Sequence, residues 1–357
     1  MDNDSAMFYT QDLIKNSPFM SQGMKASFKK SDNKGSWYFR GVADKTIFTK
    51  FSEANTSGIQ GRFGRNQKIN KTITSNTQLR LRRENRLGLN ILGDELFTVF
   101  SFKQYQINQL LTFKLTKELN LDLGGEFYFK DYDPLDNPSG SSLDQIEHTY
   151  EATFNYKPKS KKAKKFLKEI AVSFDHREKQ YQDWVNHEIV DLMADSTSPT
   201  PFLPFDSLYS YPLRRWEYNT FRLRYQLPLS KNLDARLDFR VQNRADSSQG
   251  DFGYDDKKGT LRIDWEKNSW TVGGSISYTS RNYTYRRAEQ DTIMVLPNLQ
   301  YTYFRTKLDV SKEVHPGCML NINYEIINRG SNTTAIDRRT RREYFNSLVS
   351  VGLSWAI

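Results

Sequence analysis

The chain contains 357 residues, enough for two ordinary domains or one large barrel. Hydrophobic residues make up only 37% of it, and no run approaches the roughly 18 to 20 apolar residues of a membrane-spanning helix, so a helical membrane protein is excluded. The net charge of +10 is compatible with nucleic acid, anionic lipid or anionic solutes and selects none of them.

The first third of the chain gives a weak pattern. Its N-terminus, Met1 to Ser5, has no basic segment followed by an apolar stretch, so no signal peptide is visible. We expect residues 1–21 to be a linker or the remnant of a truncation, and residues 22–357 to form a single β-barrel. In this third, strands are expected near residues 22–30, 35–48, 57–65, 71–83, 86–93 and 96–116.

From about residue 100 onwards, apolar and polar residues alternate strictly, as they do on a strand whose successive side chains point to opposite faces. The segment from Leu233 to Arg244 is the clearest case. One set of positions holds Leu233, Ala235, Leu237, Phe239 and Val241, and the other holds Asp234, Arg236, Asp238, Arg240 and Gln242. Similar segments continue to the C-terminus and predict an all-β chain of about 14–16 antiparallel strands, with no convincing helix.

The connections between these strands alternate in length. Short connections fall at 117–118, 231–232, 267–268 and 313–316, and long polar ones at 133–145, 183–215, 245–257, 287–297 and 330–339. Short periplasmic turns and long outer loops are typical of transmembrane β-barrels. Trp265, Trp270 and Trp355 all fall near the short turns, which predicts a lower aromatic girdle at that rim.

The last strand carries a more specific pattern. Its apolar face holds Phe345, Val349, Val351, Leu353, Trp355 and Ile357. The combination of Ser350, Gly352, Trp355 and Ile357 resembles the recognition signal of bacterial outer-membrane β-barrels, with Ile357 where that family usually has Phe. The resemblance implies an integral place in the bacterial outer membrane, in contact with the lipid bilayer and lipopolysaccharide. It also implies the barrel-assembly machinery as a partner.

A soluble β-sandwich alternates in the same way, so periodicity alone does not tell whether the apolar face points in or out. Three features favour the membrane barrel. Predicted strands often exceed about 10 residues, against a usual length of about 5 to 6. Their polar face is dense in Arg, Asp, Tyr and Ser, and the final strand ends at the last residue.

The polar face of the C-terminal half is the main candidate for a functional surface. With the apolar face outwards, the residues predicted to line the lumen are Arg222, Arg224, Arg236, Asp238, Arg240, Arg262, Asp264, Arg281, Arg305, Lys307 and Asp309. Arg244, Arg329, Asp234 and Glu325 belong to the same face, and the cations outnumber the acids. A water-filled pore lined in this way favours anions. The alternative is that Arg and Asp simply pair across strands and fill a narrow barrel.

Two further segments stand out. Lys157 to Lys168 reads KPKSKKAKKFLK and is the only dense charge run. It is either a solvated turn that extends two strands past the membrane or a contact for anionic headgroups, nucleic acid or an acidic partner. The loop from Asp183 to Arg215 is rich in Pro and aromatic residues, which suggests order. In porin-like proteins such a loop often folds into the pore, while here it could equally cover the rim.

The sequence gives little reason to expect catalysis. Asp175-His176 resembles the Asp–His pairs of omptin-type barrel proteases, and Glu147-His148 is a second acid–base pair. Adjacent residues on a strand face opposite sides, so neither pair converges on one substrate. No metal-ligand spacing, phosphate loop or nucleophile elbow occurs, and the single cysteine, Cys318, excludes a disulfide within the chain. No enzyme, cofactor, metal or nucleic-acid partner is expected.

Two functions of different class remain. The first is a porin-like outer-membrane channel for small polar solutes, with a preference for anions. The second is the C-terminal barrel domain of a larger outer-membrane receptor, secretion or assembly protein, with a periplasmic partner or an N-terminal domain beyond this sequence. A complete import receptor is excluded because such barrels have about 22 strands. A secreted soluble β-adhesin is a weaker alternative.

Overall fold

The protein is described by a computed structural model, which places residues 19–49, 55–89, 95–99, 101–133, 144–185, 213–246, 253–287, 297–333 and 343–355. Almost all of these residues belong to strands. The strands are β1 (Phe19–Asp32), β2 (Gly35–Phe48), β3 (Thr56–Lys68), β4 (Ile73–Leu89), β5 (Glu95–Val99), β6 (Phe102–Lys114), β7 (Leu119–Tyr132), β8 (Gln145–Tyr156), β9 (Glu169–Val185), β10 (Leu213–Ser230), β11 (Leu233–Asp246), β12 (Tyr254–Lys267), β13 (Trp270–Arg287), β14 (Asn298–His315), β15 (Cys318–Ser331) and β16 (Tyr344–Trp355). A short 3₁₀ turn, η2 (Ala163–Lys165), lies between β8 and β9.

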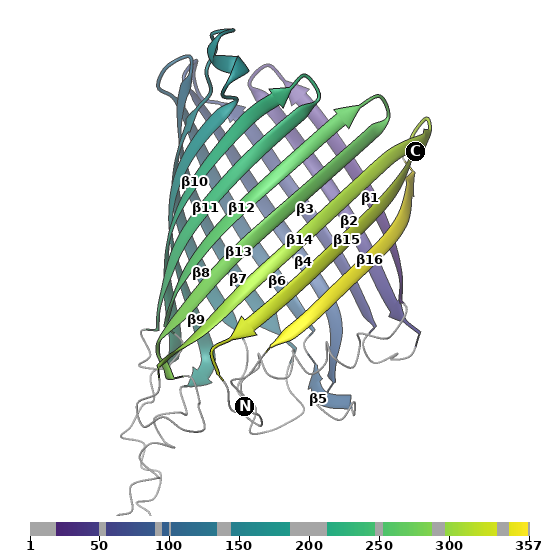
Figure 1. Ribbon diagram of the computed structural model, residues 1–357, viewed down its shortest axis with the longest axis vertical. Coiled ribbons are helices and arrows are strands. Elements are labelled where there is room, and N and C mark those ends of the chain that lie inside the picture. Colours follow the sequence, from purple (N-terminus) through teal and green to yellow (C-terminus); the bar gives the residue numbers. More distant parts are fainter. Residues whose placement is uncertain are drawn as a thin grey trace, which may run out of the picture.

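Fifteen of these strands follow one another around a tilted antiparallel wall, and β5 pairs only with the end of β4 (Figure 1). The order runs from β1 to β16 without a crossover, as in an up-and-down barrel. None of the described helical residues forms a segment long and apolar enough to cross a membrane. The prediction of an all-β antiparallel barrel of 14–16 strands is confirmed.

The strand boundaries in the first third differ from those predicted. β4 continues to Leu89 and so takes in the described part of the predicted strand 86–93, whose residues 90–93 lie outside the described residues; the predicted strand 96–116 is divided into β5 and β6. The strand passes through the charged residues 82–84, and the Arg83 Nη1 donates to the Asp133 Oδ1 at 2.7 Å. The barrel begins at Phe19, three residues before the predicted start, and β12 begins at Tyr254, inside the predicted loop 245–257.

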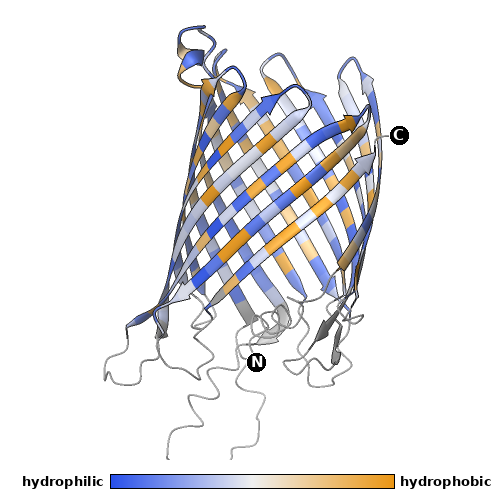
Figure 2. Ribbon diagram, turned by 45° about the vertical axis from the view of Figure 1, so that its right-hand side comes forward, coloured by the Kyte–Doolittle hydropathy of each residue, from blue (hydrophilic) through white to orange (hydrophobic). Residues whose placement is uncertain are grey.

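The two faces of the wall differ as the alternation predicts. Phe239, Tyr278 and Phe304 share one face through their cross-strand register, and each is about half exposed to solvent. Asp256 on the opposite face is fully buried. The apolar face is therefore the convex one. Apolar and polar segments are interspersed along the strands of the wall (Figure 2). Since β1–β4 and β6–β16 form a single sheet, the two-layer soluble sandwich is wrong.

One rim of the barrel carries the short connections, and we call it the tight-turn rim (top of Figure 1). Asn268 and Gly317 take positive φ values of 55° and 77° in two of these turns, a conformation that Asn and Gly tolerate best. The other rim, the long-loop rim, joins the strands through the longer connections. Of these, residues 186–212 of the predicted Asp183–Arg215 loop lie outside the described residues.

Tryptophans mark the tight-turn rim on the convex face. Trp265 and Trp270 lie there beside the β12–β13 turn, and Trp355 lies on the same face at the end of β16, opposite Cys318. Trp37 of β2 adds a fourth, which the sequence pattern did not single out. It stacks on Phe63 at 5.3 Å, and the Arg65 guanidinium lies 4.4 Å from its ring centre. Such rings suit the interface of a bilayer.

We predict that Gly35→Ala destabilises the barrel by about 1–3 kcal/mol because the added methyl overpacks the wall. An ideal Cβ on Gly35 would lie 1.9 Å from the backbone oxygen of Asn66, on the adjacent strand β3. Gly125→Ala is the matched control, since a Cβ there meets nothing within 4 Å. Urea unfolding in lipid vesicles measures both variants. Equal free energies of unfolding for the two would contradict the close approach at Gly35.

The two end strands of the wall run in the same direction. Both β1 and β16 run from the long-loop rim to the tight-turn rim, because the fourteen antiparallel steps between them restore the original direction. All residues of β1 are exposed, on its convex and concave faces alike. The described residues show no backbone pairing between β1 and β16.

Candidate site on the inner wall

The cross-strand register brings the predicted lumen residues onto one face. Arg222 of β10 lies opposite Arg240 of β11, which lies opposite Lys258 of β12. The same register carries through β13, β14 and β15. It places all of the predicted lumen residues on the concave face: Arg222, Arg224, Arg236, Asp238, Arg240, Arg262, Asp264, Arg281, Arg305, Lys307 and Asp309.

Within this face, single carboxylates each hold two cations. Asp238 lies 2.9 Å from the Nε atoms of both Arg224 and Arg236. Asp256 is fully buried and binds the Arg240 Nη2 at 2.7 Å and the Arg281 Nη2 at 3.1 Å. Each of these two groups retains a net charge of +1, so pairing and a positive surplus occur together.

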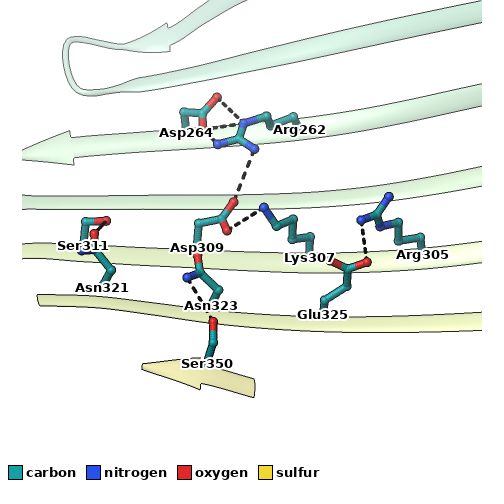
Figure 3. Close-up of polar contacts among 10 residues, drawn as sticks. All are labelled: Arg262, Asp264, Arg305, Lys307, Asp309, Ser311, Asn321, Asn323, Glu325 and Ser350. Carbon is teal, nitrogen blue, oxygen red and sulfur yellow. Dashed lines mark hydrogen bonds and ion pairs between the residues drawn. The ribbon is translucent and has the colours of Figure 1, made fainter. Parts of the chain in front are cut away.

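A third such group crosses β12 and β14 (Figure 3). Asp309 lies 3.0 Å from the Lys307 Nζ and 3.6 Å from the Arg262 Nη1. Arg262 also donates from Nε to Asp264 at 2.7 Å. This cluster of two cations and two carboxylates is neutral, and it joins β12 to β14 across the intervening strand β13. Next to it, Arg305 pairs with Glu325, a residue of β15, at 2.5 Å.

Neutral hydrogen bonds extend the ladder to the last strand (Figure 3). The Asn323 Nδ2 donates to the Ser350 Oγ of β16 at 3.3 Å, and the Ser311 Oγ donates to the Asn321 Oδ1 at 2.8 Å. Of the predicted assembly-signal residues, Ser350 and Gly352 therefore face inwards and Trp355 outwards. Ile357 lies outside the described residues.

Three cations lie side by side on the inner wall, and two of them have no ion pair among the described residues. In the row Arg222–Arg240–Lys258, only Arg240 has an ion pair, with Asp256, among the residues that the structure describes. Arg222 and Lys258 flank it on either side and face the lumen. Adjacent like charges repel each other, and an anion bound between them relieves this repulsion. This row, here called the cationic row, is the strongest candidate for contact with an anionic solute.

Sequence reasoning missed an aromatic tier on the same wall, nearer the long-loop rim. Tyr254, Tyr283 and Tyr301 pack edge to face with ring centres 5.8 Å apart in each successive pair, and all three are buried. Leu299 completes the cluster and is fully buried. These side chains occupy the positions expected to be polar, in register with Asp256 and Arg281. The signal available in the sequence was tyrosine at inward positions of three successive strands, β12, β13 and β14.

Arginines stack on these rings. The Arg281 guanidinium lies 4.1 Å from the ring centre of Tyr254, and that of Arg329 lies 3.8 Å from Tyr301. Arg244 bridges to a second buried cluster, Tyr181–Trp216–Tyr218, with 4.6 Å to the Trp216 ring centre. Cation–π contact holds these arginines against the rings of the wall. The lumen thus has an aromatic tier near the long-loop rim. Charged side chains that contact no ring of this tier lie further from that rim.

The two acid–histidine dipeptides do not converge, as expected from strand geometry. Asp175 lies opposite Thr220 on the concave face, while the His176 Nδ1 lies 2.9 Å from the Asn219 Oδ1 on the convex face. Glu147 pairs inwards with Arg177 at 3.6 Å, and His148 packs outwards on Phe127. Among the described residues no group of His, Cys, Asp or Glu could hold a metal ion.

Comparison with known proteins gives fold-level likenesses only. No protein-family model matches the chain, and no curated protein sequence matches it. Solved structures resemble it at low identity. The ferric citrate transporter FecA in its unliganded form has a TM-score of 0.46 at 9% identity, with 96% of this chain and 61% of that chain covered. The siderophore receptor PirA from Pseudomonas aeruginosa has 0.44 at 8%, with 96% and 78% covered.

A loop-deletion variant of OmpT, an outer membrane protein of Vibrio cholerae, has a TM-score of 0.41 at 8% identity, with 95% of this chain and 98% of that chain covered. The chain spans 61% of the length of the FecA structure. Its own architecture is the firmer ground: antiparallel strands in sequence order, apolar outside, polar inside, with short turns at one rim. The fold is that of an outer-membrane β-barrel.

Proposed function

We propose that the protein is an integral channel of the bacterial outer membrane that passes small polar anions. The observation that carries this proposal is the cationic row Arg222–Arg240–Lys258 on the inner wall. Its neighbours support it, since Asp238 and Asp256 each neutralise only one of their two arginines. Charged side chains that line a water-filled lumen set the sign of its potential.

The same proposal includes insertion of the barrel into the outer membrane and its orientation there. The apolar convex face and the tryptophans at the tight-turn rim suit a bilayer, with lipopolysaccharide around the long-loop rim. The pattern Ser350, Gly352 and Trp355 in the last strand supports assembly by the barrel-assembly machinery.

Conductance in planar bilayers tests the channel. We expect discrete open-channel steps, and under a salt gradient a reversal potential with the sign of anion selectivity. The folded state of the sample is checked by the change in electrophoretic mobility on boiling. A folded barrel that leaves the membrane silent, or that shows cation selectivity, would overturn the proposal.

A second function is favoured by one observation, the parallel directions of β1 and β16. A wall that is antiparallel throughout needs an odd number of further strands between them. This supports the barrel domain of a larger receptor, secretion or assembly protein. Antibodies against this chain, used on native membranes, distinguish the two cases: a band well above 41.8 kDa supports the larger protein, and a band at 41.8 kDa contradicts it.

A further inference from the structure

The connection between β8 and β9 differs from every other turn at its rim. Residues Lys157 to Lys168 contain seven lysines and no acidic residue. The segment includes η2, the coiled ribbon that stands beyond the other turns at the top of Figures 1 and 2. We call it the basic knob. The channel proposed above gives it no role.

The basic knob has a defined conformation. The backbone N–H groups of Lys157 and Lys159 donate to the backbone oxygen and the Oε1 of Glu118, both at 2.8 Å. Within the knob, the Phe166 N–H donates to the Ala163 oxygen at 3.0 Å, and Pro158 is buried. One carboxylate from the neighbouring turn therefore fixes the knob on the rim, and the lysines extend from a built support.

Most lysines of the basic knob form no ion pair with the other described residues. Lys157 pairs with Glu169 at 3.2 Å, and Lys168 pairs with Asp234. The other lysines are exposed and have no ion pair among the described residues; they are Lys159, Lys161, Lys162, Lys164 and Lys165. Phe166, between these lysines and Lys168, is 73% exposed. An exposed aromatic ring is unfavourable in water, so its position among lysines without ion pairs indicates a contact surface.

We propose that the basic knob binds the anionic phospholipid headgroups of the leaflet at the tight-turn rim. Trp37, Trp265, Trp270 and Trp355 place the edge of the bilayer at this rim, so headgroups lie beside the knob. Each basic residue close to an anionic surface strengthens attachment about fivefold, and an aromatic ring sits well at headgroup level. An acidic protein would satisfy the lysines but would leave the exposed Phe166 unexplained. The inference rests on the barrel being embedded and not on its conductance.

A single fluorescent label tests the contact. In a Cys318→Ala background, Phe166→Cys is labelled with bimane, and the barrel is placed in nanodiscs of phosphatidylcholine alone or mixed with phosphatidylglycerol. We expect a blue-shifted emission, quenched by brominated acyl chains, only in the anionic discs. About 1 M salt should abolish the difference, because the screening length then falls to about 3 Å.

Matched charge variants separate the knob from the rest of the rim. With Lys161, Lys162, Lys164 and Lys165 changed to Gln, quenching should fall to the level of the neutral discs. The control changes Lys71, Lys117, Lys231 and Lys267, which lie at or beside other tight turns, to Gln and should keep the full response. Identical emission in both discs overturns the proposal. A shift that appears only on adding polyglutamate also overturns it and identifies an acidic protein as the partner.

Discussion

Replacing Asp256 with asparagine is expected to lower the free energy of unfolding of the barrel by about 3 kcal/mol. Asp256 has no exposed side-chain surface and holds Arg240 at 2.7 Å and Arg281 at 3.1 Å. Asparagine has the same shape but no charge, so two arginines next to the aromatic tier lose their counter-ion. Urea titration in lipid vesicles, followed by tryptophan fluorescence, measures the change.

The matched control is Asp264→Asn. Asp264 is 41% exposed, and its partner Arg262 keeps a second carboxylate, Asp309, at 3.6 Å. An exposed pair of this kind contributes about 0–1 kcal/mol, so the control should unfold almost as the parent does. If both variants unfold at the parent's urea concentration, Asp256 does not anchor the wall.

Changing Arg222 and Lys258 together to Glu is expected to reverse ion selectivity from anions to cations. The double change shifts the lumen charge by four units at the cationic row. A unit charge about 10 Å from a permeating ion in water contributes about 0.4 kcal/mol, so four units alter the permeability ratio on the order of tenfold. The reversal potential under a gradient at low salt measures this, since salt screens the effect.

The control places the same charge change on the other face. Lys103 and Lys257 are exposed on the convex face, and Lys257 adjoins Lys258 in the chain. Their joint replacement by Glu should leave the reversal potential close to that of the parent. A reversal potential that moves equally in both variants, or in neither, would show that the cationic row does not control permeation.

Much of the fold could be predicted because alternation is a local property. In β11, Leu233 to Val241 repeats with period two, and that alone determines which side chains share a face. The prediction differed around residues 83–89, where separate strands near 71–83 and 86–93 were expected and β4 instead runs unbroken from Ile73 to Leu89. Close to a rim, both faces of a strand reach water, so polarity no longer marks the end of the strand.

The sequence predicted which residues line the inner wall but not which of them form ion pairs with one another. Alternation identified Arg236 and Arg240 as lumen residues, and sequence alone would choose them for charge reversal. The structure shows that both are bound, to Asp238 and Asp256, so reversing them would also break the wall. The cross-strand register decides which side chains form ion pairs. This register depends on the length of every turn along the chain, which the alternation does not give. That Arg222 and Lys258 have no ion pair among the described residues becomes apparent only once those partners are known.

The aromatic tier has a consequence for any ion that crosses the lumen. Arg244, Arg281 and Arg329 lie over aromatic rings near the long-loop mouth. Arg222 and Lys258, which have no ion pair among the described residues, lie deeper inside. The lumen is therefore chemically asymmetric along its axis. A conducting pore of this shape acts as a partial diode, passing unequal currents when the voltage is inverted.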